Sequence, residues 1–284
     1  MPDDSHRLAE QATGGSSAIK TEVRVRLYCL PALKTNYFWL LQPDEQVPEA
    51  YIFDPGDAAP VRDALQKHRL TLSGIVVTHH HWDHTDGIDS LLSTHPVPVY
   101  GPKSERIPQV THTLSEGDTL TLGRLEFQVL ATPGHTLDHI AFLLPRRGEQ
   151  PASLFSADNI FGAGCGRMFE CEPEVFLKTL KRLASLEAET RIYCSHEYTL
   201  ANIAFALAVE PENAALQRRR DSEQARRDQS EPTVPLTLAL ELATNPFLRT
   251  DQPAVAAAAE THAGATLATE AEVFAEIRRW KDHF

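Results

Sequence analysis

The sequence predicts an α/β fold in which sheets are covered by helices on their outer faces, followed by a smaller all-helical C-terminal region. Short apolar or alternating segments, typical of strands, recur between residues 23 and 194 with few helical segments among them. After residue 199 the chain becomes rich in Ala, Glu and Arg with helical spacing. Its 284 residues suffice for one large domain with an appended one.

The first elements come from alternation and from turn residues. Apolar residues alternate at 23–27, which predicts a strand, and two more strands are expected at 37–41 and 50–53. The turn Asp54-Pro55-Gly56-Asp57 separates the last of these from a helix at 59–67. The apolar run 72–77 is typical of a buried strand.

The later elements follow the same signals. Further strands are expected at 97–100, 119–122, 125–130, 140–144, 153–156 and 191–194. Helices are expected at 174–186, after Pro173, and then at 201–209, 213–228 and 271–280. Pro232 and Pro235 mark the connection between helix pairs, because proline does not continue a helix. We place a domain boundary near residues 198–202.

Composition and charge exclude several classes of function. Lys and Arg total 27 against 39 Asp and Glu, so the net charge of −12 disfavours nucleic acid as a partner. No apolar run approaches the ~20 residues of a membrane span, and the first residues lack the apolar core of a signal peptide. Four cysteines without a Cys-x-x-Cys pair favour a reducing compartment. We therefore expect a cytoplasmic protein away from membranes. We also expect a monomer, although no sequence feature specifies the oligomeric state.

A histidine-rich segment, Thr78-His79-His80-His81-Trp82-Asp83-His84, follows the buried strand at 72–77 directly. Residues two apart on an extended chain point the same way, so His79 and His81 can bind one ion. A turn into a helix would direct Asp83 and His84 toward a second position nearby. Imidazole and carboxylate suit zinc, iron or manganese, and the absence of thiolate argues against a closed structural zinc site.

Three further candidate ligands, His135, Asp158 and His196, each follow a predicted strand. Taken singly, each is more simply explained as a hydrogen-bonded polar residue. Together with the histidine segment they predict one sheet edge that gathers all of them around metal. His80 lies between two ligands and should point away from them, and His139 is expected to support a ligand or its loop.

The pattern Thr78-His79-x-His81-x-Asp83-His84 resembles the signature of the metallo-β-lactamase superfamily. Other segments are similar to those of one branch, glyoxalase II (the hydroxyacylglutathione hydrolases), and the similarity runs from about Val23 to Phe284. These segments are Leu30-Pro31-Ala32-Leu33 with Asn36-Tyr37, Ala163-Gly164-Cys165-Gly166-Arg167, Cys194-x-His196-Glu197-Tyr198-Thr199, Glu231-Pro232-Thr233-Val234-Pro235, Asn245-Pro246-Phe247 and Arg278-Arg279-Trp280-Lys281-Asp282.

The resemblance implies a metallo-β-lactamase αβ/βα sandwich with two divalent ions, zinc or alternatively iron or manganese. It implies a catalytic domain at 22–199 and a helical glutathione-binding domain at 200–284. The small, polar residues at 1–21 lie outside the similarity and are expected to form a flexible leader. By matching position, the first ion would be held by His79, His81 and His135. The second would be held by Asp83, His84 and His196, with Asp158 bridging, and Asp83 and Asp158 are the catalytic candidates. The positions matching glutathione contacts are Arg167, Phe169, Tyr198, Arg278 and Lys281.

Four positions depart from the usual pattern of the family. Ala157 and Asn159 flank Asp158 where Gly and Thr are usual, and Ser195 replaces the Gly common before the last histidine. Phe169 stands where many members have Tyr, so a hydroxyl contact to the peptide would be missing. These departures bear on substrate affinity, while every metal-ligand position is intact.

The activity that the resemblance implies is hydrolysis of the thioester S-D-lactoylglutathione to D-lactate and glutathione, the second step of methylglyoxal detoxification. A hydroxide shared by two metals would attack, since coordination lowers the pKa of water from ~15.7 toward ~7. The thiolate leaving group, with a pKa of ~8.5, needs no strong general acid. No Gly-x-Ser-x-Gly elbow supports a serine nucleophile.

Other functions are also compatible with these sequence features. A glutathione persulfide dioxygenase-like enzyme with a single iron, or another metallo-β-lactamase-fold hydrolase such as a lactonase, is compatible with the histidine segment. A nuclease of the superfamily is disfavoured by the acidic charge, and a non-catalytic binding protein by the complete ligand set.

Glutathione thioesters are anionic, so a basic patch must oppose the net charge of the chain. Arg278 and Lys281 are three residues apart and share a helix face, which could supply it if the last helix folds back over the catalytic domain. We expect Arg278 to be exposed and its substitution by Ala to raise KM several-fold with little loss of kcat.

Overall fold

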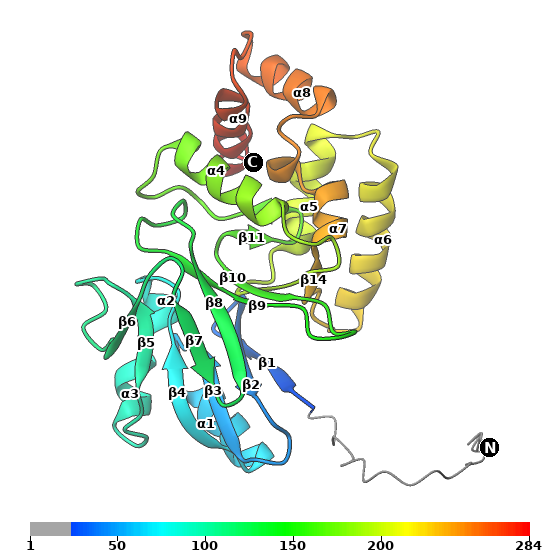
Figure 1. Cartoon of the computed structure of the whole chain (residues 1–284). Helices are drawn as coiled ribbons and strands as arrows, with labels where there is room; N and C mark the ends of the chain where they lie inside the picture. Colours follow the sequence, from blue (N-terminus) through cyan, green and yellow to red (C-terminus); the bar gives the residue numbers. More distant parts are fainter. Residues whose placement is uncertain (1–23) are drawn as a thin grey trace, which may run out of the picture.

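The computed structural model describes residues 24–284, and the expected leader at 1–21 lies outside them. Two six-stranded sheets pack face to face, and helices lie on both sides of the sandwich (Figure 1). This arrangement confirms the predicted α/β class. Among the described residues, no helix combines the length and the apolar character that crossing a membrane requires.

The first sheet has the order β1-β2-β3-β4-β5-β6, antiparallel as far as β3 and parallel from β3 to β6. Its strands are β1 (Arg26–Ala32), β2 (Asn36–Gln42), β3 (Glu49–Phe53), β4 (Thr71–Val76), β5 (Val99–Pro102) and β6 (His112–Leu114). The helices in this half are α1 (Ala58–His68), α2 (Trp82–Thr85) and α3 (Ile88–Leu92).

Strand β2 shows why this sheet is covered on both faces. Tyr37, Trp39 and Leu41 belong to the large apolar core between the sheets. Phe38 and Leu40, which point the other way, belong to a separate core with residues of α1 and α3. Every residue of β2 is therefore buried, and the strand reads as a nearly continuous apolar run rather than an alternating one.

The second sheet has the order β14-β13-β10-β9-β8-β7. Its strands are β7 (Thr119–Leu122), β8 (Leu125–Ala131), β9 (Ile140–Leu144), β10 (Ser153–Ala157), β13 (Arg191–Cys194) and β14 (Leu236–Thr237), and a small hairpin pairs β11 (Ile160–Phe161) with β12 (Gly164–Cys165). Phenylalanines fill the space between the sheets: the rings of Phe53 and Phe155 stack with centroids 4.3 Å apart.

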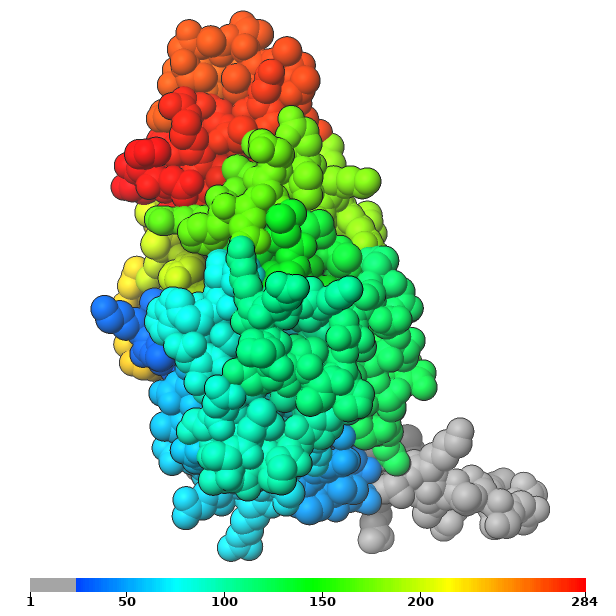
Figure 2. Space-filling view, turned by 90° about the vertical axis from the view of Figure 1, so that its left-hand side faces the viewer, coloured from blue at the N-terminus to red at the C-terminus, as the bar shows by residue number. Residues whose placement is uncertain are grey.

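The C-terminal part is helical apart from β14, and its helices lie beside the second sheet with α4 (Figure 1). The helices are α4 (Pro173–Ala184), α5 (Thr199–Val209), α6 (Ala214–Asp228), α7 (Leu238–Thr244), the 3₁₀ helix η1 (Pro246–Leu248), α8 (Pro253–Ala263) and α9 (Glu270–Asp282). Thr269 and Glu272 form a capping box that starts α9. In Figure 2, the red α9 packs directly against the green α4 region of the sandwich.

Most expected elements are present, with small shifts at their ends. The strand expected at 23–27 instead spans Arg26–Ala32, because seven of its residues pair with β2. Several elements were not expected, most of them too short to leave a periodic pattern: α3, β6, β11, β12, α7, η1 and α8. The all-helical description of the C-terminal part needs one correction: β14 pairs with β13 and extends the second sheet.

Candidate metal centre

The seven predicted ligands lie together at one edge of the sandwich, where four strands end. His79 and His81 follow β4, His135 follows β8, Asp158 follows β10 and His196 follows β13. Groups of these side chains offer nitrogen and oxygen atoms within 4.8 Å of one another. The convergence of strand ends expected from the sequence is thus present in the structure.

Local contacts direct the histidine segment. The backbone N–H and the hydroxyl of Thr78 both donate to the carboxylate of Asp54, at 2.7 and 2.9 Å. The chain then enters the short helix α2, whose N-cap is His81, and this turn redirects Asp83 and His84 as expected. Gly56 lies against this helix: a Cβ there would be 2.0 Å from the carbonyl oxygen of Asp83, so only glycine permits the approach.

His79, His81 and His135 form a first group. The Nδ1 of His81 is 3.2 Å from the Nε2 of His79 and 2.9 Å from the Nε2 of His135. The other nitrogen of His135 donates to the carbonyl of Arg167 at 2.8 Å, which leaves its Nε2 lone pair directed at the group. The Nδ1 of His79 is likewise 2.9 Å from the hydroxyl of Thr78.

The protonation of this first group suits metal binding. Burial lowers the pKa of His79 well below its usual value. Burial and the neighbouring His135 lower the pKa of His81 to about 4. Both imidazoles are therefore neutral near pH 7, and the neutral ring is the form that coordinates a cation.

Asp83, His84 and His196 form a second group. The Oδ2 of Asp83 is 3.4 Å from the Nε2 of His196 and 3.7 Å from that of His84, and it accepts a 3.0 Å hydrogen bond from the amide of Asn36. Burial alone would lower the pKa of His196, but the charges of Asp158 and Asp83 raise it to about 9. The carboxylates therefore favour positive charge at this position.

Asp158 lies between the two groups and turns one oxygen to each. Its Oδ1 is 3.4 Å from the Nε2 of His84 and 3.5 Å from that of His196, and its Oδ2 is 3.3 Å from the Nε2 of His135. Burial would raise the pKa of this carboxyl, but His196 and His84 outweigh burial and hold it well below the usual value. An ionised carboxylate thus faces both groups at once.

One buried atom tests whether these residues fit a cation. The Nε2 of His84 is fully buried and makes no hydrogen bond to any residue in 24–284, although such groups in proteins are almost always satisfied. It faces the carboxylates of Asp83 and Asp158. With five imidazoles, two carboxylates and no thiolate, the cluster can hold divalent metal ions.

Two aromatic side chains predicted to contact substrate border the site. The ring of Phe169, which is 60% exposed, lies 5.2 Å from the rings of both His81 and His135. The ring of Tyr198 stacks on that of His196 at 4.7 Å. These side chains therefore form exposed walls beside the two groups of ligands.

The basic residues of α9 lie partly as expected. The last helix does fold back: Lys281 donates to the carbonyl of Ala201 at 3.2 Å, and Arg167 is 3.4 Å from Asp282. The expectation that Arg278 is exposed is wrong, because only 4% of the surface of this residue is accessible to solvent. Its guanidinium donates to the carbonyl of Cys165 at 3.0 Å and to Asp282 at 2.9 Å.

Several residues that shape the site were not predicted. Asp54 anchors Thr78, and the only sequence signal was a polar residue directly after β3, the strand beside β4. Asn36 holds Asp83, and its role depends on a contact between β2 and the distant segment around α2. The two expected non-ligands behave differently from ligands: His80 turns away to Asp138 at 2.9 Å, and His139 stacks on His79.

Comparison with known proteins follows the two halves of the chain. Residues 38–196 match the model of the metallo-β-lactamase superfamily, and residues 197–284 match the model described as the hydroxyacylglutathione hydrolase C-terminus. A metallo-β-lactamase from Staphylococcus aureus superposes with a TM-score of 0.60 at 22% identity, covering 92% of this chain and 72% of that one. The fold and the site therefore define a member of the metallo-β-lactamase superfamily.

Relatives narrow this class. Hydroxyacylglutathione hydrolase of Idiomarina loihiensis is 47% identical over 259 residues, covering 91% of this chain and 100% of that protein. That of Xanthomonas campestris is 48% identical over 261 residues, covering 92% and 99%. The chain belongs to the hydroxyacylglutathione hydrolase (glyoxalase II) family, as the sequence predicted. The structure of TTHA1623 in a di-iron-bound form has a TM-score of 0.55 at 25% identity, covering 77% of this chain and 98% of that one.

Proposed function

We propose that this chain is a thioester hydrolase that converts S-D-lactoylglutathione to D-lactate and glutathione in methylglyoxal detoxification. The observation that carries the proposal is the carboxylate of Asp158, whose two oxygens are divided between two groups of ligand side chains. Family membership over nearly the whole chain supports the substrate, because the matched relatives carry the name of this activity.

Two divalent ions would be held by these groups, the first by His79, His81 and His135 and the second by Asp83, His84 and His196, with Asp158 shared. When bound, such ions supply a water of lowered pKa and polarise the thioester carbonyl. The hydrogen bonds to Thr78, Arg167 and Asn36 then serve to orient the ligands, a role that commonly governs metal affinity.

The residues around the site would bind the glutathione part of the substrate. Phe169 and Tyr198 offer apolar walls beside the ligands, and Arg167 and Lys281 supply positive charge against the net charge of −12. We assign Arg278 a different task from direct contact: it holds the turn at Cys165, from which Arg167 projects. The leaving thiolate has an ordinary pKa of ~8.5, so no side chain is needed to protonate it strongly.

We propose zinc as the ion, since the ligand set accepts it, with iron and manganese as alternatives. We also propose a monomer in the cytoplasm, and a division into a catalytic domain at 22–199 and a glutathione-binding domain at 200–284.

The test follows the loss of the thioester of S-D-lactoylglutathione with purified protein, before and after treatment with a chelator. Rapid hydrolysis that chelation abolishes and added metal restores is the expected result. A protein that holds two ions per chain and leaves the thioester intact would contradict the substrate assignment. A thioester and lactone panel, together with an assay for oxygen-dependent oxidation of glutathione persulfide, would then separate the other hydrolases from the dioxygenase-like alternative.

A further inference from the structure

Ser195 stands directly before His196, at the end of β13, where glyoxalase II commonly has glycine. Its residue is only 3% exposed, and its hydroxyl donates a hydrogen bond to the Oδ1 of Asp158. A glycine at this position has no side chain and cannot make this bond. The departure from the usual residue therefore adds a donor to the carboxylate that lies between the two groups of ligands.

The oxygen that accepts this hydrogen bond faces only one of the two groups of ligands. Oδ1 is the oxygen that faces His84 and His196, whereas Oδ2 faces His135. A donor on Oδ1 restricts rotation of the carboxylate and fixes the direction in which this oxygen faces the second group. Its effect on metal binding should thus be unequal between the two groups.

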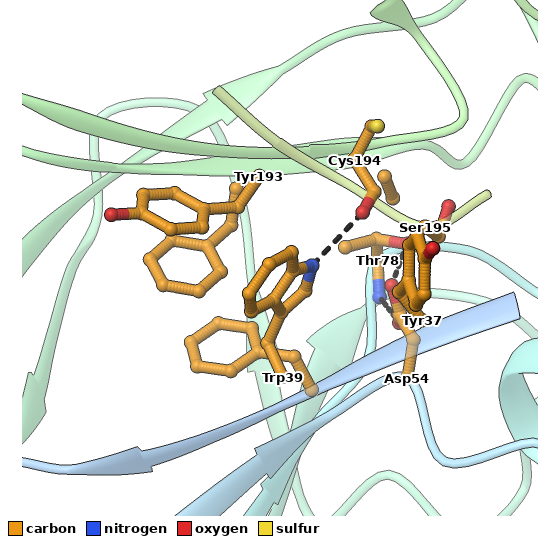
Figure 3. Close-up of a pocket in the computed structure, with 10 residues that line it drawn as sticks. Tyr37, Trp39, Asp54, Thr78, Tyr193, Cys194 and Ser195 are labelled. Atoms are coloured by element: carbon orange, nitrogen blue, oxygen red, sulfur yellow. Dashed lines mark hydrogen bonds between the residues drawn. The ribbon is translucent and has the colours of Figure 1, made fainter. Parts of the chain in front are cut away.

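The backbone that carries this hydroxyl is held from the opposite sheet. The carbonyl of Ser195 accepts a 2.7 Å hydrogen bond from the backbone N–H of Tyr37, and the indole of Trp39 donates to the carbonyl of Cys194 at 2.9 Å. Figure 3 shows these residues together around a small cavity that Asp54 and Thr78 also line. Hydrogen bonds from β2 therefore hold the backbone of Cys194 and Ser195, the two residues directly before His196.

Alanine or glycine at position 195 has no hydroxyl and would leave the Oδ1 of Asp158 without this donor. A threonine, in contrast, would keep the donor.

We propose that Ser195 is a positioning residue for Asp158, and that its hydroxyl strengthens binding of the ion held by Asp83, His84 and His196 more than binding of the ion held by His79, His81 and His135. The inference rests on the proposed two-ion function of the site. Hydrogen-bond partners of ligands commonly contribute about 10–100-fold to metal affinity. We expect an effect of this size at the second group alone.

The experiment measures two dissociation constants for Zn²⁺ by competition with a chromophoric chelator, using metal-free full-length chain. Ser195→Ala and Ser195→Gly should weaken the second-group ion by about 10–100-fold and leave the other within about threefold. Ser195→Thr should retain both affinities. Asp83→Asn identifies which binding step belongs to the second group, and Co²⁺ absorption spectra report the same step independently of activity.

Equal affinities in the wild-type protein and in both Ser195→Ala and Ser195→Gly would overturn the inference, as would an equal loss at both groups. Urea unfolding of the metal-free variants separates a general loss of stability from a specific loss of affinity. Thioester hydrolysis is measured separately on fully loaded wild-type protein. A wild-type chain that binds two ions and hydrolyses no thioester refutes the substrate, while the effect of Ser195 on affinity is still decided by the titration.

Discussion

The metal centre and the junction between the sandwich and the C-terminal helices are both buried and rich in charged side chains, yet they differ in how those side chains are satisfied. At the centre, His84 has a buried ring nitrogen without a hydrogen bond to any described residue. At the junction, Glu241 is fully buried and its carboxylate is saturated: it pairs with Arg219 and accepts from the backbone of Ala163 at 2.8 Å and from Asn245 at 3.1 Å.

The two regions are adjacent in the chain at Glu197. It follows the ligand His196, but its carboxylate accepts hydrogen bonds from the hydroxyl of Tyr37 at 2.7 Å and from the backbone and hydroxyl of Thr233 at 2.9 and 2.8 Å. This carboxylate therefore links β2 to the segment after α6. A carboxylate with all its partners supports the fold, whereas one that faces unpaired imidazoles offers a place for a cation.

We expect the largest effect on metal binding and hydrolysis from a substitution at Asp158. Among residues 24–284, Asp158 carries the one carboxylate that faces both groups, so we expect Asp158→Ala to abolish paired metal binding and thioester hydrolysis together, with the fold retained. Metal content per chain and the hydrolysis rate check this. A variant that keeps two ions and full activity would contradict the bridging role. Asp138→Ala is a matched control, since that carboxylate pairs with His80 outside the ligand set.

The second-largest expected effect is on the free energy of unfolding rather than on metal binding. Glu241→Ala leaves Arg219 as a buried charge without its main partner, and breaking such a pair costs about 3–5 kcal/mol of the free energy of unfolding. Urea denaturation measures the loss. The double variant Arg219→Met with Glu241→Leu should lose less, because no unpaired charge remains. Metal stoichiometry of the folded fraction should stay at the wild-type value; a loss of bound metal as large as that of Asp158→Ala would erase the distinction between the regions.

Arg278 sharpens the comparison because it lies at the junction and donates to the carbonyl of Cys165, in the turn that bears Arg167. Arg278→Ala removes charge-assisted hydrogen bonds to Cys165 and Asp282 and should lower the free energy of unfolding by about 1.5–3 kcal/mol. We expect KM to rise several-fold as the turn bearing Arg167 loosens, with little change in kcat. A rise in KM with unchanged stability would instead indicate direct contact with substrate.

The smallest effect is expected at Ala157, which lies where the pairing of β10 with β13 changes register and has a φ of +43°. Glycine adopts this left-handed backbone without the steric cost of a Cβ, a cost that exceeds the entropy glycine adds to the unfolded chain. Ala157→Gly should raise the free energy of unfolding by about 0.5–1 kcal/mol. Thermal denaturation measures it, and metal affinity serves as the control that should not move. A destabilised Ala157→Gly protein would refute the claim of local strain.

The sequence by itself determined the fold class, the family and the positions of the candidate ligands. Alternation and apolar runs are local signals, and the ligand positions follow directly after strands such as β4, β8 and β13. It could also indicate that His80 points away, because neighbouring residues on an extended chain alternate in direction. These features required no knowledge of which distant segments pack together.

Tertiary structure alone decided the contacts that tune and support the site. Ser195 reaches Asp158 across 37 residues, and Arg278 reaches Cys165 across 113. The burial of Arg278, the anchoring of Thr78 by Asp54 and the addition of β14 to the second sheet likewise depend on packing between segments distant in the chain. Local periodicity specifies which face of an element is apolar, but the partner of a polar atom is set by the neighbour that packing brings within hydrogen-bond distance.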